Sequence, residues 1–428
     1  MRRETRSVCP VCLRNLPARL VGEPGGTVLL EKTCPEHGSF AVTVWQGKLD
    51  FDAWCAGSTP LPAGAGQRCV AGCGLCGEHA SETCCILLEV TRRCNLRCRY
   101  CFADGGAAAE DPPGTVLESA IRDISARCGG PLLQLSGGEP TLRDDLPELV
   151  RYAKSAGCSY VQVNTNGLRL AREPDYAKQL AEAGLDIVFL QFDGTREEIF
   201  EQLRGAPLLE EKLEAIRICA ALGVGVTLVP TVVRGVNDDD LGALVTLAAS
   251  LSPGVRGVHF QPVSYFGRFP NRAERGSRYT LDELMYDLHQ QAGLPMSSFL
   301  PSRCDHPLCG FHAAFLIGEG GVLQPLTTAA PPTGRSSARE NREYVARRWT
   351  RSAPEPKPAA GSGDDFDSFL YRVRHESLTL SAMAFQDAGN LNIERLRRCS
   401  LHVYDNGRIV PFCAHYLSAV PETDENHE

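Results

Sequence analysis

The sequence predicts an α/β protein whose core is a partial (β/α)6 barrel, a TIM-like barrel with fewer than the full eight units. Residues 86–265 repeat a unit of roughly thirty residues, in which a short β-branched run precedes a polar loop and an amphipathic helix. The expected helices end near glycines, as helix C-termini do. Cysteine-rich segments flank the repeats, and they predict metal-binding extensions on both sides of the barrel.

We divide the 428 residues into four parts. Residues 1–57 are expected to form a metal ribbon, residues 58–85 an auxiliary cluster segment, and residues 86–300 the barrel. Residues 301–428 are expected to form a C-terminal domain with a further auxiliary cluster. Within this domain, residues 331–365 are rich in Pro, Ala, Gly, Ser and Arg and lack an apolar period, so they predict a mobile insertion.

Charge and composition exclude several function classes. The chain has 44 basic and 52 acidic residues and a net charge of −8, so it lacks the basic face expected of a nucleic-acid-binding protein. No apolar run approaches the roughly 18 residues of a transmembrane segment, and no signal segment is evident. We therefore expect a cytoplasmic protein whose 19 cysteines mostly bind metal as thiolates.

The N-terminal ribbon contains two ligand pairs separated by a β-like stretch. Cys9 and Cys12 form the first pair, and Cys34 and His37 form the second. Two such turns can hold one tetrahedral ion. Cys55 could replace His37 and give a rubredoxin-like iron with four thiolates, so the spacing leaves iron and zinc open.

The motif "CNLRCRYC" directly follows the first expected strand of the barrel. Its thiols belong to Cys94, Cys98 and Cys101. Three thiolates can hold three irons of a [4Fe–4S] cluster and leave the fourth iron open to a substrate or cofactor. The next strand ends in "SGGEP", where glycines expose backbone groups and Glu139 could accept hydrogen bonds from an ammonium group.

This C-x3-C-x2-C loop, with Tyr100 before its last cysteine and GGEP on the next strand, resembles the radical S-adenosylmethionine (SAM) superfamily. In that superfamily the open iron binds SAM, and one electron splits SAM into methionine and a 5′-deoxyadenosyl radical that removes hydrogen from an unactivated carbon. The resemblance implies that the three cysteines hold the cluster. It places Gly137, Gly138 and Glu139 at the methionine amine, with Phe102 and Ala103 near the adenine.

Polar side chains at later strand ends are expected to face the mouth of the barrel. They could bond the ribose or the substrate, although ordinary loop caps are an alternative. These residues are Asn164, Asn166, Gln191, Asp193 and Gln261.

Two further cysteine sets predict auxiliary [4Fe–4S] clusters. Cys69, Cys73 and Cys76 precede the barrel, and Cys84 supplies a fourth thiolate, with Cys85 as an alternate. Four ligands close a cluster, although a zinc site is the alternative. The second set flanks the insertion and consists of Cys304, Cys309, Cys399 and Cys413. The isolated thiols of Cys128, Cys158 and Cys219 are expected to pack in the core.

Motifs along nearly the whole chain resemble one branch of the radical SAM superfamily, which includes archaeal tetraether lipid synthase and proteins described as dihydropterin methyltransferases. The quoted motifs include "CPVC", "CGLC", "LQLSGGEPTLRDDLPELV", "GVHFQPVSYFGR" and "PFC". The resemblance implies three [4Fe–4S] clusters and one mononuclear iron or zinc. We also expect a low-potential electron donor of the flavodoxin or ferredoxin type.

The expected activity is hydrogen abstraction from an unactivated carbon. The first hypothesis is a hydrophobic or lipid-like substrate and C–C bond formation. The alternatives are radical methyl transfer to a pterin-like heterocycle and modification of a peptide or protein. A non-enzymatic electron carrier or metal-regulated binding module would need neither the GGEP motif nor an open iron.

Overall fold

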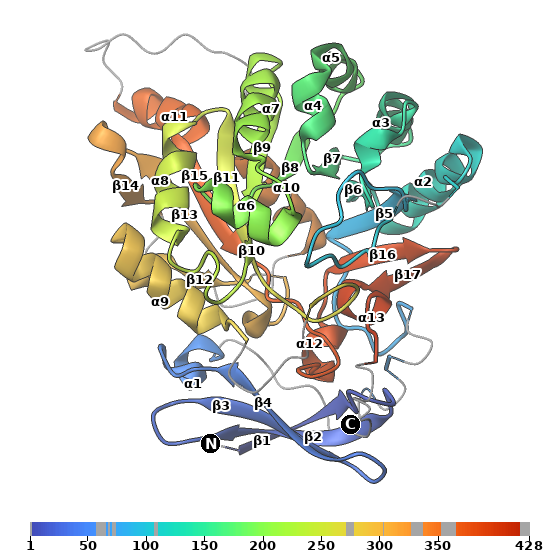
Figure 1. The fold of residues 1–428 in the computed structure, drawn as a ribbon, viewed down its shortest axis with the longest axis vertical. Coiled ribbons are helices and arrows are strands. Elements are labelled where there is room, and N and C mark those ends of the chain that lie inside the picture. Colours follow the sequence, from blue (N-terminus) through green and yellow to red (C-terminus); the bar gives the residue numbers. More distant parts are fainter. Residues whose placement is uncertain are drawn as a thin grey trace.

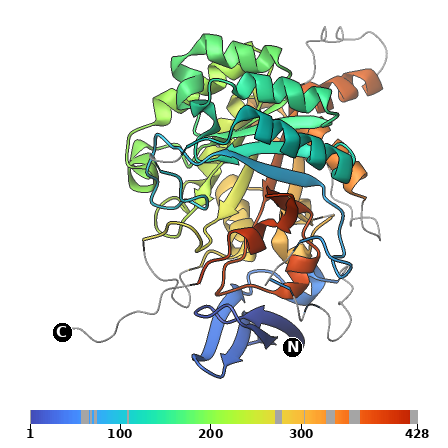
Figure 2. The same ribbon diagram turned by 90° about the vertical axis from the view of Figure 1, so that its right-hand side faces the viewer.

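The computed structural model describes residues 2–56, 66, 69–70, 74–106, 110–270, 278–302, 304–326, 337–351 and 365–419. Its described strands form a four-stranded sheet and a thirteen-stranded sheet. The small sheet lies at one end of the molecule in both ribbon views (Figures 1 and 2).

The small sheet is antiparallel, and its strands follow chain order. A short helix after it brings Phe51 edge to face against Trp45, with ring centroids 5.6 Å apart. The elements are β1 (Arg2–Val8), β2 (Asn15–Gly22), β3 (Val28–Cys34), β4 (Gly38–Trp45) and α1 (Phe51–Trp54).

The large sheet contains all six predicted strands as parallel neighbours. These six strands are fully or largely buried, as expected where helices cover a parallel sheet. Their bounds are β5 (Cys85–Thr91), β6 (Leu132–Gly137), β7 (Tyr160–Thr165), β8 (Ile187–Gln191), β9 (Gly225–Val229) and β11 (Val255–Pro262), with β10 (Thr231–Val232) beside β11.

Helices cover the outer face of these strands (Figure 1). In α3, for example, Leu146, Leu149, Val150 and Ala153 are buried, which is the spacing of one apolar helix face. These helices are α2 (Gly114–Cys128), α3 (Leu146–Ser155), α4 (Leu168–Arg172), α5 (Pro174–Glu182), α6 (Glu197–Arg204), α7 (Leu209–Ala221) and α8 (Leu241–Ser250). The next helix, α9 (Leu281–Ala292), packs against α8 and β4.

The C-terminal part of the chain extends the barrel sheet. β15 (Ser377–Ala382) pairs parallel with β11, and β16 (Leu401–Asp405) pairs parallel with β5. Residues 301–428 were expected to form a domain of their own, and the structure shows that strands of this segment join the barrel sheet. The two strands are too short for their pattern to show which sheet they join. The antiparallel additions are β12 (Leu300–Pro301), β13 (Phe311–Ile317), β14 (Leu323–Pro325) and β17 (Arg408–Pro411).

A helix lies inside the segment predicted to be a mobile insertion. The described residues 337–351 contain α10 (Ala338–Trp349), whereas residues 327–336 and 352–364 lie outside the described residues. Ser337 and Glu340 form a capping box at its start. Trp349 packs into a buried cluster with Phe189 and Val229, so this part of the prediction was wrong. The S-x-x-E signal of the capping box was overlooked.

Helix α10 lies at the amino ends of the barrel strands. Arg342 donates to the carbonyls of Thr83, just before β5, and Gly129, just before β6, at 3.0 and 3.2 Å. A Cβ atom on Gly225, the first residue of β9, would lie 2.3 Å from the carbonyl oxygen of Trp349. Glycine is therefore required at this contact, and α10 covers the amino end of the barrel on this side.

The remaining helices are short. None of the helices in the described part of the chain combines the length and apolar character needed to cross a membrane. They are α11 (Asp365–His375), α12 (Ile393–Arg397) and α13 (Phe412–His415), with 3-10 turns η1 (Pro140–Leu142), η2 (Met296–Ser298), η3 (Pro307–Cys309) and η4 (Glu319–Gly321).

Candidate active site

The three thiols of the loop after β5 face one cavity of about 340 Å³ that lies within the barrel. Cys94, Cys98 and Cys101 all line it. Burial is the main reason that the pKa of Cys94 is raised to about 11, and the nearby Glu139 carboxylate and the two neighbouring thiols act in the same direction. Three thiols on one loop at a cavity wall form a donor set that fits an iron–sulfur cluster with one open iron.

The two glycines of the GGEP turn allow β6 to approach the cysteine loop closely. A Cβ atom on Gly137 would lie 2.1 Å from the Thr91 carbonyl oxygen, and one on Gly138 would lie 2.1 Å from that of Arg93. The Gly138 amide donates to Thr91 at 2.8 Å. Only glycine fits at these two positions, and both line the cavity beside the cysteines.

Glu139 is buried and connects the ends of β6 and β7. Its carboxylate accepts from the amide of Thr141 at 3.0 Å, the hydroxyl of Thr165 at 2.6 Å and the amide of Asn166 at 2.7 Å. Glu139 also lines the cavity. The contact of Glu139 with a methionine amine stays a prediction. The structure shows that its carboxylate already connects the loops after β6 and β7.

Asp193 does not face the cavity, contrary to expectation. Its carboxylate accepts two hydrogen bonds from Arg204, at 2.5 and 2.7 Å, and both side chains are buried. Arg204 itself lines the cavity and donates to the Tyr100 carbonyl in the cysteine loop at 3.3 Å. The sequence interpretation missed Arg204. The available signal was its place on the apolar face of α6, one turn after Phe200.

The other four predicted polar residues do line the cavity: Asn164, Asn166, Gln191 and Gln261. Two of them are held by Lys212 of α7, which the sequence interpretation also missed. The ammonium of Lys212 donates to the Asn166 carbonyl at 2.8 Å and to the Gln191 side chain at 2.9 Å. Burial lowers the pKa of Lys212 to about 8.

A second chain segment clamps the cysteine loop. Cys101 and Arg268 exchange backbone hydrogen bonds at 2.9 and 3.0 Å, and the Arg268 guanidinium donates to Gly105 at 2.7 Å. Phe102 lines the cavity as predicted, with its ring 5.5 Å from Phe412. Ala103 is not among the described residues that line the cavity.

The predicted N-terminal ligands converge on one point. One ligand atom from each of Cys9, Cys12, Cys34 and His37 lies within 4.8 Å of the others. This donor set fits a single tetrahedral ion. Cys55 is not in the group, because it lies buried in the main core after α1.

Two protein-family models match parts of this chain. Residues 88–248 match the model of the radical SAM superfamily, and residues 1–46 match the HMPTM N-terminal zinc ribbon domain. The chain is 31% identical to 7,8-dihydro-6-hydroxymethylpterin dimethyltransferase of Methanocaldococcus jannaschii over 99% of this chain and 95% of that protein. It belongs to the radical SAM superfamily, in one family with this archaeal protein.

Two further likenesses cover only part of this radical SAM protein. It is 30% identical to GTP 3′,8-cyclase of Limosilactobacillus fermentum over 57% of this chain and 72% of that protein. The crystal structure of Streptococcus suis SuiB aligns with 50% of this chain and 46% of its own, at 14% identity and a TM-score of 0.39.

The auxiliary cysteines of this radical SAM protein group differently from the prediction. The thiols of Cys84 and Cys304 are hydrogen-bonded to each other, although they were assigned to different sets. Cys69 instead packs in one buried cluster with Cys413. Cys73 lies outside the described residues. The cysteines were grouped by their distance along the sequence. In the fold, β16 pairs with β5, and this brings the C-terminal segment close to Cys84.

The remaining auxiliary thiols do not form a compact single-ion site. Burial is the main cause of the raised pKa of the Cys399 thiol, and the nearby thiols of Cys309 and Cys413 raise that pKa too. Cys76 is exposed, and Cys85 is half-buried and lines the cavity. Within the described ranges, the N-terminal ribbon is the one place where three or more potential ligand atoms lie within 4.8 Å of one another.

Proposed function

We propose that this protein cleaves SAM reductively and modifies a planar heterocycle of the pterin type by radical methyl transfer. Two observations support the proposal. The relative that matches over nearly its full length is named for a dihydropterin substrate. The cavity wall is mainly apolar, and polar side chains from several strands project into it, which suits a small organic ligand with hydrogen-bonding edges.

Cys94, Cys98 and Cys101 would hold the [4Fe–4S] cluster, and the GGEP turn would bind SAM beside it. When bound, the cluster and SAM supply the radical that removes a hydrogen atom. The protein would position these groups through the close contact of Gly138 with the cysteine loop, and a bound substrate would displace water from the cavity.

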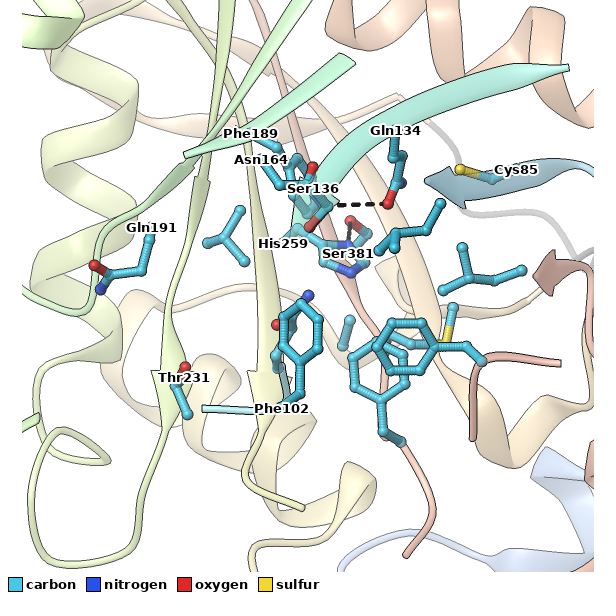
Figure 3. Close-up of a pocket in the computed structure, with 18 of the residues that line it drawn as sticks. Cys85, Phe102, Gln134, Ser136, Asn164, Phe189, Gln191, Thr231, His259 and Ser381 are labelled. Atoms are coloured by element: carbon cyan, nitrogen blue, oxygen red, sulfur yellow. Dashed lines mark hydrogen bonds between the residues drawn. The ribbon is translucent and has the colours of Figure 1, made fainter. Parts of the chain in front are cut away.

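The polar side chains on the inner wall of the cavity favour a heterocyclic substrate over a hydrocarbon chain. Gln134 and Asn164 project from neighbouring strands, with the Asn164 amide 3.3 Å from the Gln134 carbonyl oxygen (Figure 3). His259 and Ser381 form a second pair at the same cavity. These groups already bond one another, and a heterocycle offers ring nitrogens and carbonyls to the donors and acceptors that remain, such as Nε2 of His259. A hydrocarbon chain would leave those remaining atoms without a partner, at a cost of about 1–3 kcal/mol for each.

A lipid-like substrate is the second candidate function, and the rest of the cavity wall favours it. Large apolar side chains dominate the wall toward the C-terminal segment: Phe266, Phe311, Phe385, Leu401 and Phe412. This candidate would couple hydrogen abstraction to C–C bond formation on a chain end.

We further propose that the auxiliary cysteines bind [4Fe–4S] clusters. A low-potential flavodoxin-type or ferredoxin-type partner would supply electrons. The Cys84 and Cys304 thiols line the same cavity as the cysteine loop, which supports a role for this pair close to the substrate. Because Cys84 and Cys304 lie together, these two thiols would share a cluster, although the sequence analysis placed them in different sets.

The proposal is tested with anaerobically reconstituted protein, dithionite and SAM. We expect 5′-deoxyadenosine, and its rate should rise when 7,8-dihydro-6-hydroxymethylpterin is added. With methyl-labelled SAM, label should enter the pterin and S-adenosylhomocysteine should accumulate. Cys98→Ala should abolish all these products. Deuterium transfer into 5′-deoxyadenosine from a labelled lipid, with none from the pterin, would favour the second candidate.

A further inference from the structure

Helix α10 forms part of the cavity wall at the end remote from the cysteine loop. Asn341, Tyr344, Val345 and Trp349 all line the cavity, and their spacing places them on one face of the helix. Because α10 lies at the amino ends of the strands, these side chains form the floor of the cavity.

His259 of β11 stands above this floor. It is largely buried, with 9% of the residue exposed. Its Nδ1 atom lies 2.8 Å from the hydroxyl of Ser381, its register partner on β15. The imidazole also packs between the rings of Phe189, at 5.2 Å, and Trp349, at 5.8 Å. These three neighbours fix the orientation of the ring.

The second ring nitrogen of His259 is available to a ligand. Figure 3 shows the imidazole directed into the open space between the strands, with its hydrogen bond to Ser381 on one side. Among the described residues, no hydrogen-bond partner is found for Nε2. Burial lowers the pKa of His259 to about 4, so the ring is neutral at pH 7 and Nε2 either donates or accepts one hydrogen bond.

The position of His259 along its strand separates it from the SAM motifs. His259 and Gln261 lie two residues apart on β11, so they share one face of the sheet and are roughly 7 Å apart along the strand. Gln261 is nearer the carboxyl end, where the GGEP turn and the cysteine loop lie. His259 therefore lies deeper in the cavity than the residues that would bind SAM.

We propose that His259 is the substrate-binding residue of the cavity floor, where its Nε2 atom bonds an edge of the heterocycle while Ser381 and Trp349 position the ring. This inference rests on the proposed function, because it assigns that function's substrate to a place in the cavity. The ligand class is a planar heterocycle with hydrogen-bonding edges, and aromatic rings beside His259 suit contact with its faces.

The test uses 7,8-dihydro-6-hydroxymethylpterin and the reconstituted full-length protein. His259→Phe keeps an aromatic ring between Phe189 and Trp349 but removes both nitrogens. We expect the KM for the pterin to rise about tenfold, the size of one lost hydrogen bond of about 1.4 kcal/mol. The dissociation constant for SAM should stay within twofold. His259→Gln restores one amide donor and acceptor and should recover part of the KM, which a purely structural role would not predict.

A fluorescence measurement locates the ligand independently. The chain has three tryptophans, and Trp349 is the one that lines the cavity. Pterin bound at the floor should quench the emission of Trp349. The quench should therefore disappear in Trp349→Phe and persist in the control Trp54→Phe, whose indole bonds the Pro307 carbonyl elsewhere.

The outcomes separate this inference from the proposed function. If the wild type methylates the pterin and His259→Phe has an unchanged KM, the floor site is wrong and the proposed function stands. A quench that persists in Trp349→Phe also overturns the floor site. If the wild type neither binds nor methylates the pterin, both proposals fail together.

Discussion

The guanidinium of Arg204 binds the carboxylate of Asp193 through two short hydrogen bonds, and the same guanidinium contacts the cysteine loop. Arg204 reaches the Tyr100 carbonyl within that loop, and it donates to the hydroxyl of Thr231 at 2.9 Å. The buried pair thus connects α6, the end of β8 and the loop that carries the three thiols.

Removing one partner of this pair should be costly. Asp193→Ala leaves Arg204 buried without its counter-ion, so the free energy of unfolding should fall by about 3–5 kcal/mol. The double variant Asp193→Leu with Arg204→Met should recover most of that loss, because neither charge remains buried. Denaturant unfolding of the three proteins measures both effects. A loss below about 1 kcal/mol in the single variant would contradict this role for the pair.

Gly138→Ala should disrupt the SAM site through the backbone. The added Cβ would lie 2.1 Å from the Arg93 carbonyl, next to Cys94, so the cysteine loop must move. We expect at least a tenfold fall in 5′-deoxyadenosine formation and a lower iron content. Gly77→Ala is the matched control, since its Cβ would meet nothing within 4 Å. Equal activity in the two variants would show that the close contact is dispensable.

The ion of the N-terminal ribbon should depend on His37 and not on Cys55. His37→Ala removes one of four converging ligands, so elemental analysis should show the loss of one ion per chain or its release to a weaker chelator. Cys55→Ala should keep the ion, because that thiol is buried in the core. The reverse result would favour the rubredoxin-like arrangement with four thiolates. The same analysis identifies the metal as iron or zinc.

The buried Lys212 should make stability depend on pH. Its pKa in the folded state is lowered to about 8, below the value near 10.4 of an exposed lysine. Between these values the unfolded chain binds more protons, so the free energy of unfolding rises with pH. From pH 7 to pH 10 the stability of the wild type relative to Lys212→Met should increase by about 2–3 kcal/mol. A constant difference would show that Lys212 titrates normally.

Much of the barrel was predictable because its signals are local. Each of the six strands is a short β-branched run, and a glycine-ended amphipathic helix separates most of them. The cysteine loop and GGEP turn follow consecutive parallel strands, and their meeting at one edge of the sheet is a consequence of strand direction alone. The N-terminal ligands also met as predicted, since a hairpin ribbon brings two nearby turns together.

Contacts between distant segments could not be predicted in the same way. Asp193 has the sequence position of a cavity residue, yet Arg204 turns its carboxylate into the wall. Cys84 was expected to share a site with Cys69, Cys73 and Cys76, but its thiol is hydrogen-bonded to that of Cys304. In both cases the neighbour comes from a distant part of the sequence, so it could be identified only in the folded protein.

The superfamily, the parallel β/α units of the central barrel and the three thiols at its mouth could be predicted from the sequence, because they depend on spacing and period. That the C-terminal strands extend the barrel sheet, and that α10 lies at the amino ends of its strands, became visible only in the folded protein. The C-terminal strands and α10 are too short for their hydrophobic patterns to show which element each one packs against. Burial of Trp349 against Phe189 and His259 fixes where α10 lies, and such a contact exists only once the strands have assembled.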